Sequence, residues 1–115
     1  MRKKFGAAFA GIVYCFCTQI NMVIHFLAAL TVILAGLYFH IERWEWVALT
    51  LTITLVLVAE ALNTALEVTL NAYTRAFHPE VKVAKDVAAG AVLLAALGSV
   101  VVGYLIFGPR LRGVF

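Results

Sequence analysis

The chain has 115 residues, of which 64% are hydrophobic and only 13% are charged, and its formal net charge is +3. Soluble domains contain about 45–50% apolar residues, so this composition excludes an ordinary water-soluble fold and favours a membrane protein. The basic residues lie near the chain ends and in one polar segment, which suits anionic headgroups or phosphates and argues against a nucleic-acid-binding protein.

The first part of the chain must be divided before it can be fitted to a bilayer. No Lys, Arg, Asp or Glu occurs between Lys4 and Glu42. One helix over this stretch would be about 55 Å long, against a hydrocarbon core of ~30 Å. The polar patch Thr-Gln-Ile-Asn at 18–21 is the best break. We therefore expect a short surface helix at about 5–16 and a first transmembrane span at about 22–39.

Two further apolar segments follow, and we expect the whole chain, 1–115, to form one membrane-embedded domain. The second span is predicted at about 46–70, after aromatic residues typical of a membrane interface. The third is predicted at about 87–107, ended by Gly108-Pro109. Residues 71–86 form the only long polar connection in this interpretation. The predicted fold is all-α, with three transmembrane helices and an N-terminal surface helix.

The distribution of basic residues predicts the orientation. The N-terminus and the polar connection together carry six Lys and Arg residues, against three in the first loop and at the C-terminus. By the positive-inside rule, the N-terminus is cytoplasmic and the C-terminus lies outside. We therefore expect a multi-pass protein of the cell inner or plasma membrane.

The histidines and cysteines give no sign of a metal site of their own. His25, His40 and His78 lack the spacing of metal ligands and are interpreted as structural or interfacial. Cys15 and Cys17 form a lone pair with no second pair to complete four ligands. We expect both cysteines to be small packing residues.

The second span carries a polar stripe. Glu60, Asn63, Glu67 and Asn71 are three, four and four residues apart, which places them on one face of a helix, with Thr64 beside them. A central carboxylate costs about 2.5–3.5 kcal/mol on insertion scales, so two acids at this depth need partners, protonation or a function. They could simply pair with basic residues of neighbouring helices and fix the packing.

Depth favours a functional site over packing alone. About 14 residues separate Trp46 from Glu60, or roughly 21 Å of helical rise, so the acids approach the cytoplasmic side of the bilayer. A lipid headgroup and a cytosolic nucleotide could meet there. Lys85 and Asp86 are expected to open the third helix, where free backbone N–H groups favour anions.

The sequence contains no GxxxxGK[ST] loop and no protein-kinase glycine loop or HRD motif. Phosphoryl transfer needs mainly positioning, a metal ion and charge neutralisation, so their absence does not exclude it. An acid to accept a hydroxyl proton, acids to hold magnesium and a lysine for phosphate would suffice. Glu60, Glu67 and Lys85 could supply these groups.

The third span has a small-sided surface, which predicts close helix packing. A chain this short encloses little of a site alone, so we expect a homo-oligomer. The small residues of the third span are Ala88, Ala89, Gly90, Ala91, Ala95, Ala96 and Gly98.

Two ordered segments carry a resemblance to a known family. EALNTALE at 60–67 and HPEVKVAKDVAAGAVLLA at 78–95 closely resemble the prokaryotic diacylglycerol kinase family, which includes the undecaprenol kinases. The similarity extends more weakly upstream through Gly11 and Asn21-x-x-x-His25, and so covers nearly the whole chain. The resemblance implies a homotrimer of three-span subunits with shared active sites that use ATP and Mg²⁺.

The same resemblance implies roles for individual residues. Glu60 matches the catalytic base, and Glu67 matches a magnesium ligand. Asn63 matches an active-site polar contact. Lys85 and Asp86 match residues on the nucleotide side. The F-H-P and AKDVAAGAVLL sequences are closer to the undecaprenol kinase branch. This likeness favours undecaprenol over diacylglycerol as the lipid.

The chain departs from the family pattern at the implied metal site. Gln19 stands where the family usually has a metal-binding Glu before x-Asn-x-x-x-His, and Ile20 replaces the adjoining basic residue. Asn71 stands where the family usually has Asp, four residues after Glu67. An amide keeps a carbonyl oxygen but loses the charge, so magnesium binding should weaken rather than vanish.

The most direct hypothesis is therefore an ATP-dependent lipid kinase that phosphorylates a membrane lipid alcohol at the cytoplasmic face. A rival is a non-catalytic membrane assembly protein that keeps the fold but has lost turnover through the Gln19 and Asn71 changes. A third hypothesis, an ion or proton pathway through Glu60 and Glu67, is weakened by the apolar first and third spans, which offer few polar residues to continue it.

Overall fold

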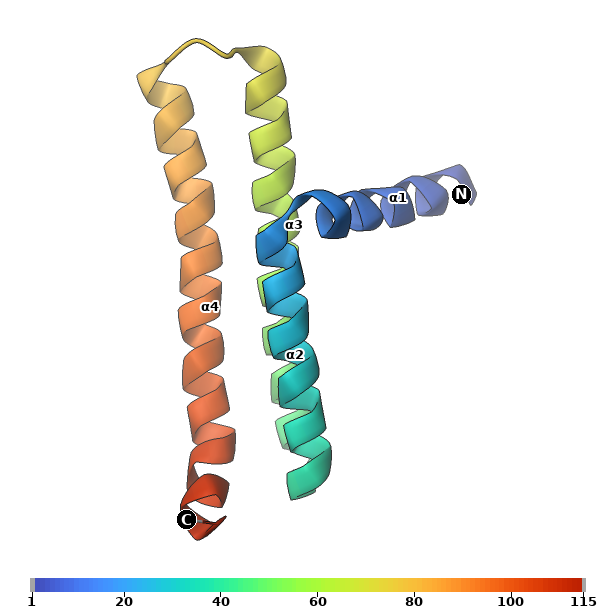
Figure 1. Cartoon of the computed structure of the whole chain (residues 1–115), viewed down its shortest axis with the longest axis vertical. Helices are drawn as coiled ribbons and strands as arrows, with labels where there is room; N and C mark the ends of the chain where they lie inside the picture. The colour runs from blue at the N-terminus through green and yellow to red at the C-terminus, as the bar shows by residue number, and fades with distance from the viewer. Residues whose placement is uncertain (1, 115) are drawn as a thin grey trace.

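The computed structural model describes residues 2–114, which form four α-helices joined by short connections (Figure 1). Three of these helices are long and apolar enough to cross a membrane. The expected all-α fold, with an N-terminal helix and three candidate spans, is confirmed. The trimer stays a prediction. The helices are α1 (Arg2–Thr18), α2 (Ile20–Phe39), α3 (Arg43–Tyr73) and α4 (Pro79–Val114).

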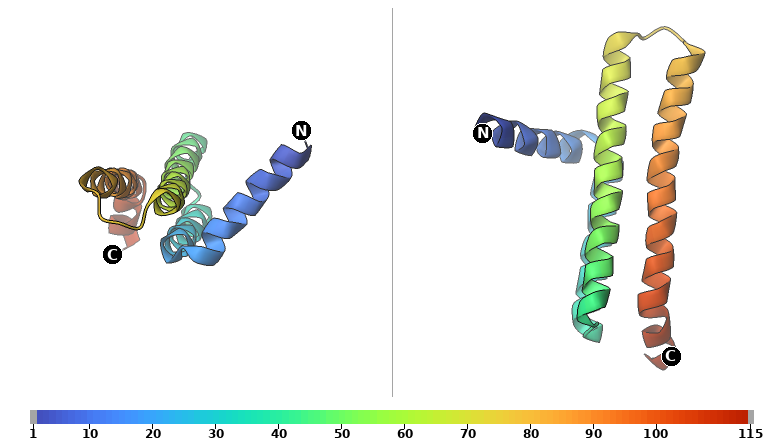
Figure 2. Two further views of the ribbon diagram at one scale, coloured as in Figure 1. Left: turned by 90° about the horizontal axis from the view of Figure 1, so that it is seen from above. Right: turned by 180° about the vertical axis from the view of Figure 1, so that it is seen from behind.

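The three long helices run side by side, and α1 projects sideways from them (Figures 1 and 2). We call the end that carries the α3–α4 connection, residues 74–78, the hairpin end, and the end that carries residues 40–42 the turn end. Helices α3 and α4 continue past α1 toward the hairpin end, whereas α2 begins at the level of α1. Because α3 has 31 residues, or about 46 Å, it is longer than the bilayer core requires.

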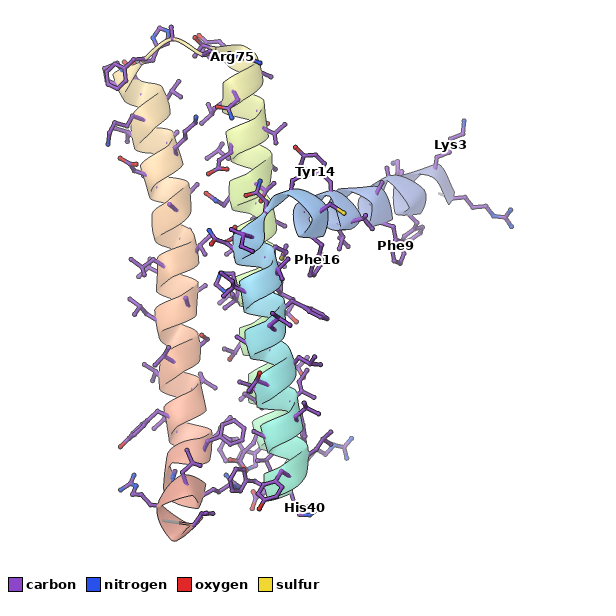
Figure 3. All side chains as sticks on the ribbon, in the orientation of Figure 1. Lys3, Phe9, Tyr14, Phe16, His40 and Arg75 are labelled. Atoms are coloured by element: carbon purple, nitrogen blue, oxygen red, sulfur yellow. The ribbon has the colours of Figure 1, made fainter. Side chains whose placement is uncertain are left out.

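The chain divides at Gln19, inside the polar patch that predicted the break. Gln19 has extended backbone (φ −116°, ψ 109°), and its N–H donates to the Cys15 carbonyl at 2.9 Å. Figure 3 shows Phe9 and Phe16 pointing from α1 toward the turn end, with Lys3 on the opposite side. This arrangement suits a helix that lies on a membrane surface with Phe9 and Phe16 directed into the bilayer.

The turn end holds the packed core. Helix α2 ends at His40, which adopts a left-handed conformation (φ 52°). The last turn of α2 requires glycine at Gly36, because a Cβ there would lie 2.7 Å from the Trp46 ring. Helix α3 starts with a capping box between Glu42 and Glu45, which satisfies free backbone N–H groups. The buried apolar cluster around this turn comprises Ile41, Leu49, Ile106 and Phe107.

The hairpin end differs from the sequence prediction. The polar connection expected over 71–86 is mostly helical, and α4 begins at Pro79. Proline favours the first helical position, and the Lys82–Asp86 ion pair (2.7 Å) links successive turns. Lys85 and Asp86 consequently lie in the second turn of α4. The prediction that they open the helix and meet its free N–H groups is wrong.

The end of α4 also differs from expectation. The prediction that Gly108-Pro109 ends the helix is wrong, because α4 continues to Val114 with Pro109 inside it. Proline cannot donate to the carbonyl of Leu105, which normally weakens a helix. Arg110 counters this loss, since its guanidinium donates both to the Ile106 carbonyl (2.6 Å) and to Glu45 of α3. The last turns of α4 are thus fastened to the start of α3.

Candidate active site

The polar stripe of α3 is buried in the half nearer the turn end and becomes exposed toward the hairpin end. Glu60 is only 1% exposed, and it is the most deeply buried large side chain in residues 2–114. Asn63 and Thr64, one turn nearer the hairpin end, are also buried. Glu67 is half-buried and Asn71 is exposed. The stripe therefore runs from a dry interior at Glu60 to an open surface at the hairpin end.

Glu60 has one carboxylate oxygen near a partner and one without. Its Oε2 lies 3.6 Å from Nε2 of His25, which is on the facing side of α2. Its Oε1 has no hydrogen-bond partner within residues 2–114, and neither has Oδ1 of the neighbouring Asn63. Buried polar atoms nearly always have partners, so two such acceptors one turn apart indicate a site built for a donor from elsewhere. A hydroxyl group is such a donor.

The hairpin end provides a cationic cleft above this acid. Lys85 Nζ of α4 donates to Asn71 Oδ1 of α3 at 2.7 Å and so ties the two helices together. The cleft around this bond has a volume of about 730 Å³. Its lining includes Asn71, Thr74, Arg75, Ala76, Phe77, His78, Val81, Lys82, Lys85 and Asp86. Three cationic side chains on one cleft suit a polyanionic ligand such as a nucleotide phosphate chain.

The His25–Glu60 contact also fixes the relative heights of α2 and α3. These helices are antiparallel (Figure 1). Gln19 precedes His25 by six residues, or about 9 Å, toward the hairpin end. Glu67 follows Glu60 by seven residues, or about 10 Å, in the same direction. Gln19 and Glu67 therefore lie at nearly equal heights, and Asn71 and Lys85 follow about one turn above them.

The oxygen ligands that the chain offers near Glu67 would bind magnesium only together with oxygen atoms of a substrate. Among residues 2–114, no three His, Cys, Asp or Glu side chains are close enough to hold a metal ion. Magnesium commonly takes one or two protein carboxylates and completes its shell with substrate phosphates and water. One carboxylate, Glu67, and one amide oxygen, Gln19, would meet that requirement at its lower limit.

Sequence reasoning assigned His25 no catalytic part and overlooked two further groups. His25 was expected to be structural or interfacial, although its place in Asn21-x-x-x-His25 was visible. Arg75, which lines the cleft, was counted only among the basic residues of the polar connection. The ion pair between Glu45 and Arg110 joins residues 65 positions apart, and no local pattern could have revealed it.

Comparison with known proteins agrees with the resemblance inferred from the two ordered segments. The sequence model described as "Prokaryotic diacylglycerol kinase" matches residues 6–107. A protein named diacylglycerol kinase from Synechocystis sp. is 44% identical over 109 residues, which cover 94% of this chain and 62% of the relative. The chain thus spans less than two thirds of that relative's length. A protein named undecaprenol kinase from Bacillus subtilis is 39% identical over 109 residues, covering 95% of this chain and 89% of the relative.

Proposed function

Because the chain belongs to the prokaryotic diacylglycerol kinase family of membrane lipid kinases, we propose that it transfers the terminal phosphate of ATP to a membrane lipid alcohol. The observation that carries the proposal is the buried Glu60 carboxylate with its unpartnered Oε1. Glu60 lies about 10 Å nearer the turn end than Glu67, so the proposal puts it on the bilayer side of the cleft, where a lipid hydroxyl would have to reach it. The phosphate-binding cleft lies on the other side.

In this mechanism Glu60 is the general base. The lipid hydroxyl donates its proton to Oε1 as its oxygen attacks the γ-phosphorus. A new P–O bond forms to the lipid, the bond from the γ-phosphorus to the bridging oxygen breaks, and ADP leaves with that electron pair. A positioned base typically contributes about 10²–10⁴-fold to a rate. Asn63, whose Oδ1 also lacks a partner, would contact the lipid hydroxyl or a phosphate oxygen.

The nucleotide would occupy the cationic cleft at the hairpin end. Lys85 and Arg75 line this cleft and would contact phosphate oxygens, and Lys85 would exchange its bond with Asn71 for one to phosphate. Asp86 is paired with Lys82, so it would hold that lysine at the cleft rather than contact phosphate itself. Glu67 and Gln19 would hold magnesium, which neutralises charge on the transferring phosphate.

We further propose that three copies form the working enzyme in the inner or plasma membrane, with the N-terminus and the hairpin end cytoplasmic. Support comes from α4, a 36-residue helix of which only Ile106 and Phe107 are buried. A Cβ at Gly90 or Gly98 would meet nothing within 4 Å in a single subunit. This open stretch of small residues is suited to close packing against another copy. Cross-linking in native membranes should stop at three copies, whereas a stable monomer in mild detergent would contradict the proposal.

We favour undecaprenol over diacylglycerol as the substrate, because the Phe77-His78-Pro79 wording is closer to the undecaprenol kinase branch. The relatives are named for each of these two lipids, so the assay must compare them directly. The test is transfer of radiolabelled phosphate from ATP to undecaprenol and to diacylglycerol in matched bilayer discs. Label on undecaprenol is the expected result. Label on neither lipid would favour the non-catalytic assembly protein.

A further inference from the structure

We propose that His25 is a positioning residue for the reaction: its imidazole holds Oε2 of Glu60, so that Oε1 stays turned toward the lipid hydroxyl. The inference rests on the proposed role of Glu60 as the base. It assigns a function to a side chain of α2 that touches neither the cleft nor the implied magnesium ligands.

A buried glutamate needs such a partner if it is to act from one orientation. The Glu60 side chain rotates about three bonds, and the hydrogen bond that the Thr64 hydroxyl donates at 3.0 Å reaches only the Glu60 backbone carbonyl. That bond leaves the carboxylate free to turn. Nε2 of His25 lies 3.6 Å from Oε2 and can donate to it when that ring nitrogen carries a proton. Catalytic hydrogen bonds are often long before substrate binds and tighten in the complex.

The other polar side chains that line the cavity beside His25 are bonded to their own helices. A cavity of about 90 Å³ begins at His25 and is lined mainly by apolar side chains of α2, α3 and α4. Its two hydroxyl residues bond to their own helices: Thr52 donates to the Ala48 carbonyl at 2.7 Å, and Ser99 donates to the Ala96 carbonyl at 2.6 Å. The Glu60 side chain itself is only 1% exposed, so little water competes with His25 for its carboxylate.

The two carboxylate oxygens consequently have different tasks. Oε2 is held from the α2 side, and Oε1 remains the acceptor for the substrate proton. A positional error of about 1 Å at a reacting group can lower a rate by roughly 10²-fold. Removal of the imidazole should therefore reduce turnover while leaving nucleotide binding intact. His25 and the cleft lie at different heights along α3, so the two effects can be separated.

The test compares His25→Ala, His25→Gln and Val32→Ala in the full-length protein, measuring kcat and the KM for ATP. Val32 is the matched control, because it lies seven residues along the same face of α2 and lines the same cavity without touching Glu60. We expect His25→Ala to lower kcat about 10- to 100-fold with an unchanged KM for ATP. His25→Gln retains an N–H donor and should recover most of that loss. Val32→Ala should stay within about twofold of the parent protein, since it removes only packing.

Three results would overturn the proposal. They are a normal kcat in His25→Ala, an equal loss in Val32→Ala, or no recovery in His25→Gln. If His25→Ala does not assemble, the comparison of His25→Gln with His25→Asn still decides, because both carry an amide donor but only Gln approaches the reach of the imidazole. The Glu60→Gln variant distinguishes failure of the proposed base from failure of the proposed positioning role. Full activity in that variant would refute the base itself, whereas an inactive Glu60→Gln with an active His25→Ala would refute only the positioning role.

Discussion

Helix α3 carries two buried glutamates in opposite settings. Glu45, at the turn end, is 4% exposed and bonds to both terminal nitrogens of Arg110 as well as to the backbone of Glu42. Glu60, nearer the hairpin end, is 1% exposed and has one oxygen without a partner. Burial alone therefore does not distinguish an acid that joins two helices from the acid that we propose as a base. The distinction lies in which oxygens are already satisfied.

The contrast extends to the two ends of the molecule. At the turn end, the apolar cluster, the capping box and the bidentate ion pair all serve to join α3 to α4 and α2. Toward the hairpin end, α3 and α4 continue past α1, and the link between them includes the polar bond from Lys85 to Asn71. A packed turn end and an open hairpin end would suit a site that receives one substrate from the membrane and another from water.

The largest expected effect comes from neutralising the unsatisfied acid. Glu60→Gln keeps the shape of the side chain but removes the proton acceptor, so kcat should fall by at least about 10²-fold. Size-exclusion chromatography in detergent should show unchanged assembly. Glu80→Gln, the same change at an exposed position of α4, is the control and should leave kcat unaltered. Retention of full activity in Glu60→Gln would remove this residue from the mechanism.

The next effect concerns the open cleft. Lys85→Ala removes the cation that bridges to Asn71, and the KM for ATP should rise about tenfold, because charge-assisted bonds to phosphate contribute roughly 1.5–3 kcal/mol. The measurement is initial rate against ATP concentration at saturating lipid. Lys3→Ala removes an exposed lysine from α1 and should not change this KM. An unchanged KM in Lys85→Ala would place the nucleotide elsewhere.

Removing the Arg110 partner of Glu45 should lower the stability of the protein and leave its kcat unchanged. Arg110→Ala leaves Glu45 buried without its guanidinium partner and frees the last turns of α4, so the thermal midpoint in detergent should fall by on the order of 5 °C. Arg112→Ala, at an exposed position two residues later, is the control. The kcat of the folded Arg110→Ala protein should match the parent value at low temperature. A large loss of kcat instead would mean that the two ends of α3 are coupled.

Local patterns in the sequence predicted the local features of this fold. The long uncharged stretch and its polar patch gave the break at Gln19, because a bilayer limits the length of a single span. The spacing of Glu60, Asn63 and Glu67 gave the stripe, because helical periodicity is a local property.

Contacts between helices were not accessible in the same way. The His25–Glu60 and Glu45–Arg110 pairs join residues 35 and 65 positions apart, and their formation depends on how α2 and α4 settle against α3. Helix ends were misjudged where polarity was taken as a loop signal. Residues 79–86 are charged and also helical, because Pro79 starts the helix and the Lys82–Asp86 pair supports it.

The smallest expected effect tests whether the open half of α3 holds a metal. Gln19 and Glu67 lie at nearly equal heights, so a carboxylate introduced at position 19 could share a divalent ion with Glu67. A hard cation binds an ionised oxygen better than a neutral amide, and Gln19→Glu should therefore lower the magnesium concentration for half-maximal activity several-fold. Activity is titrated with magnesium for Gln19→Glu, Glu67→Gln and the double variant. Two ligands on one ion should give non-additive effects, so that Gln19→Glu gains little when Glu67 is already neutral.

If Gln19 only marks the helix break, the new glutamate would face headgroups and leave the titration unchanged. Strictly additive effects would mean that the two positions do not share an ion, and the metal site would then have to be built from other residues.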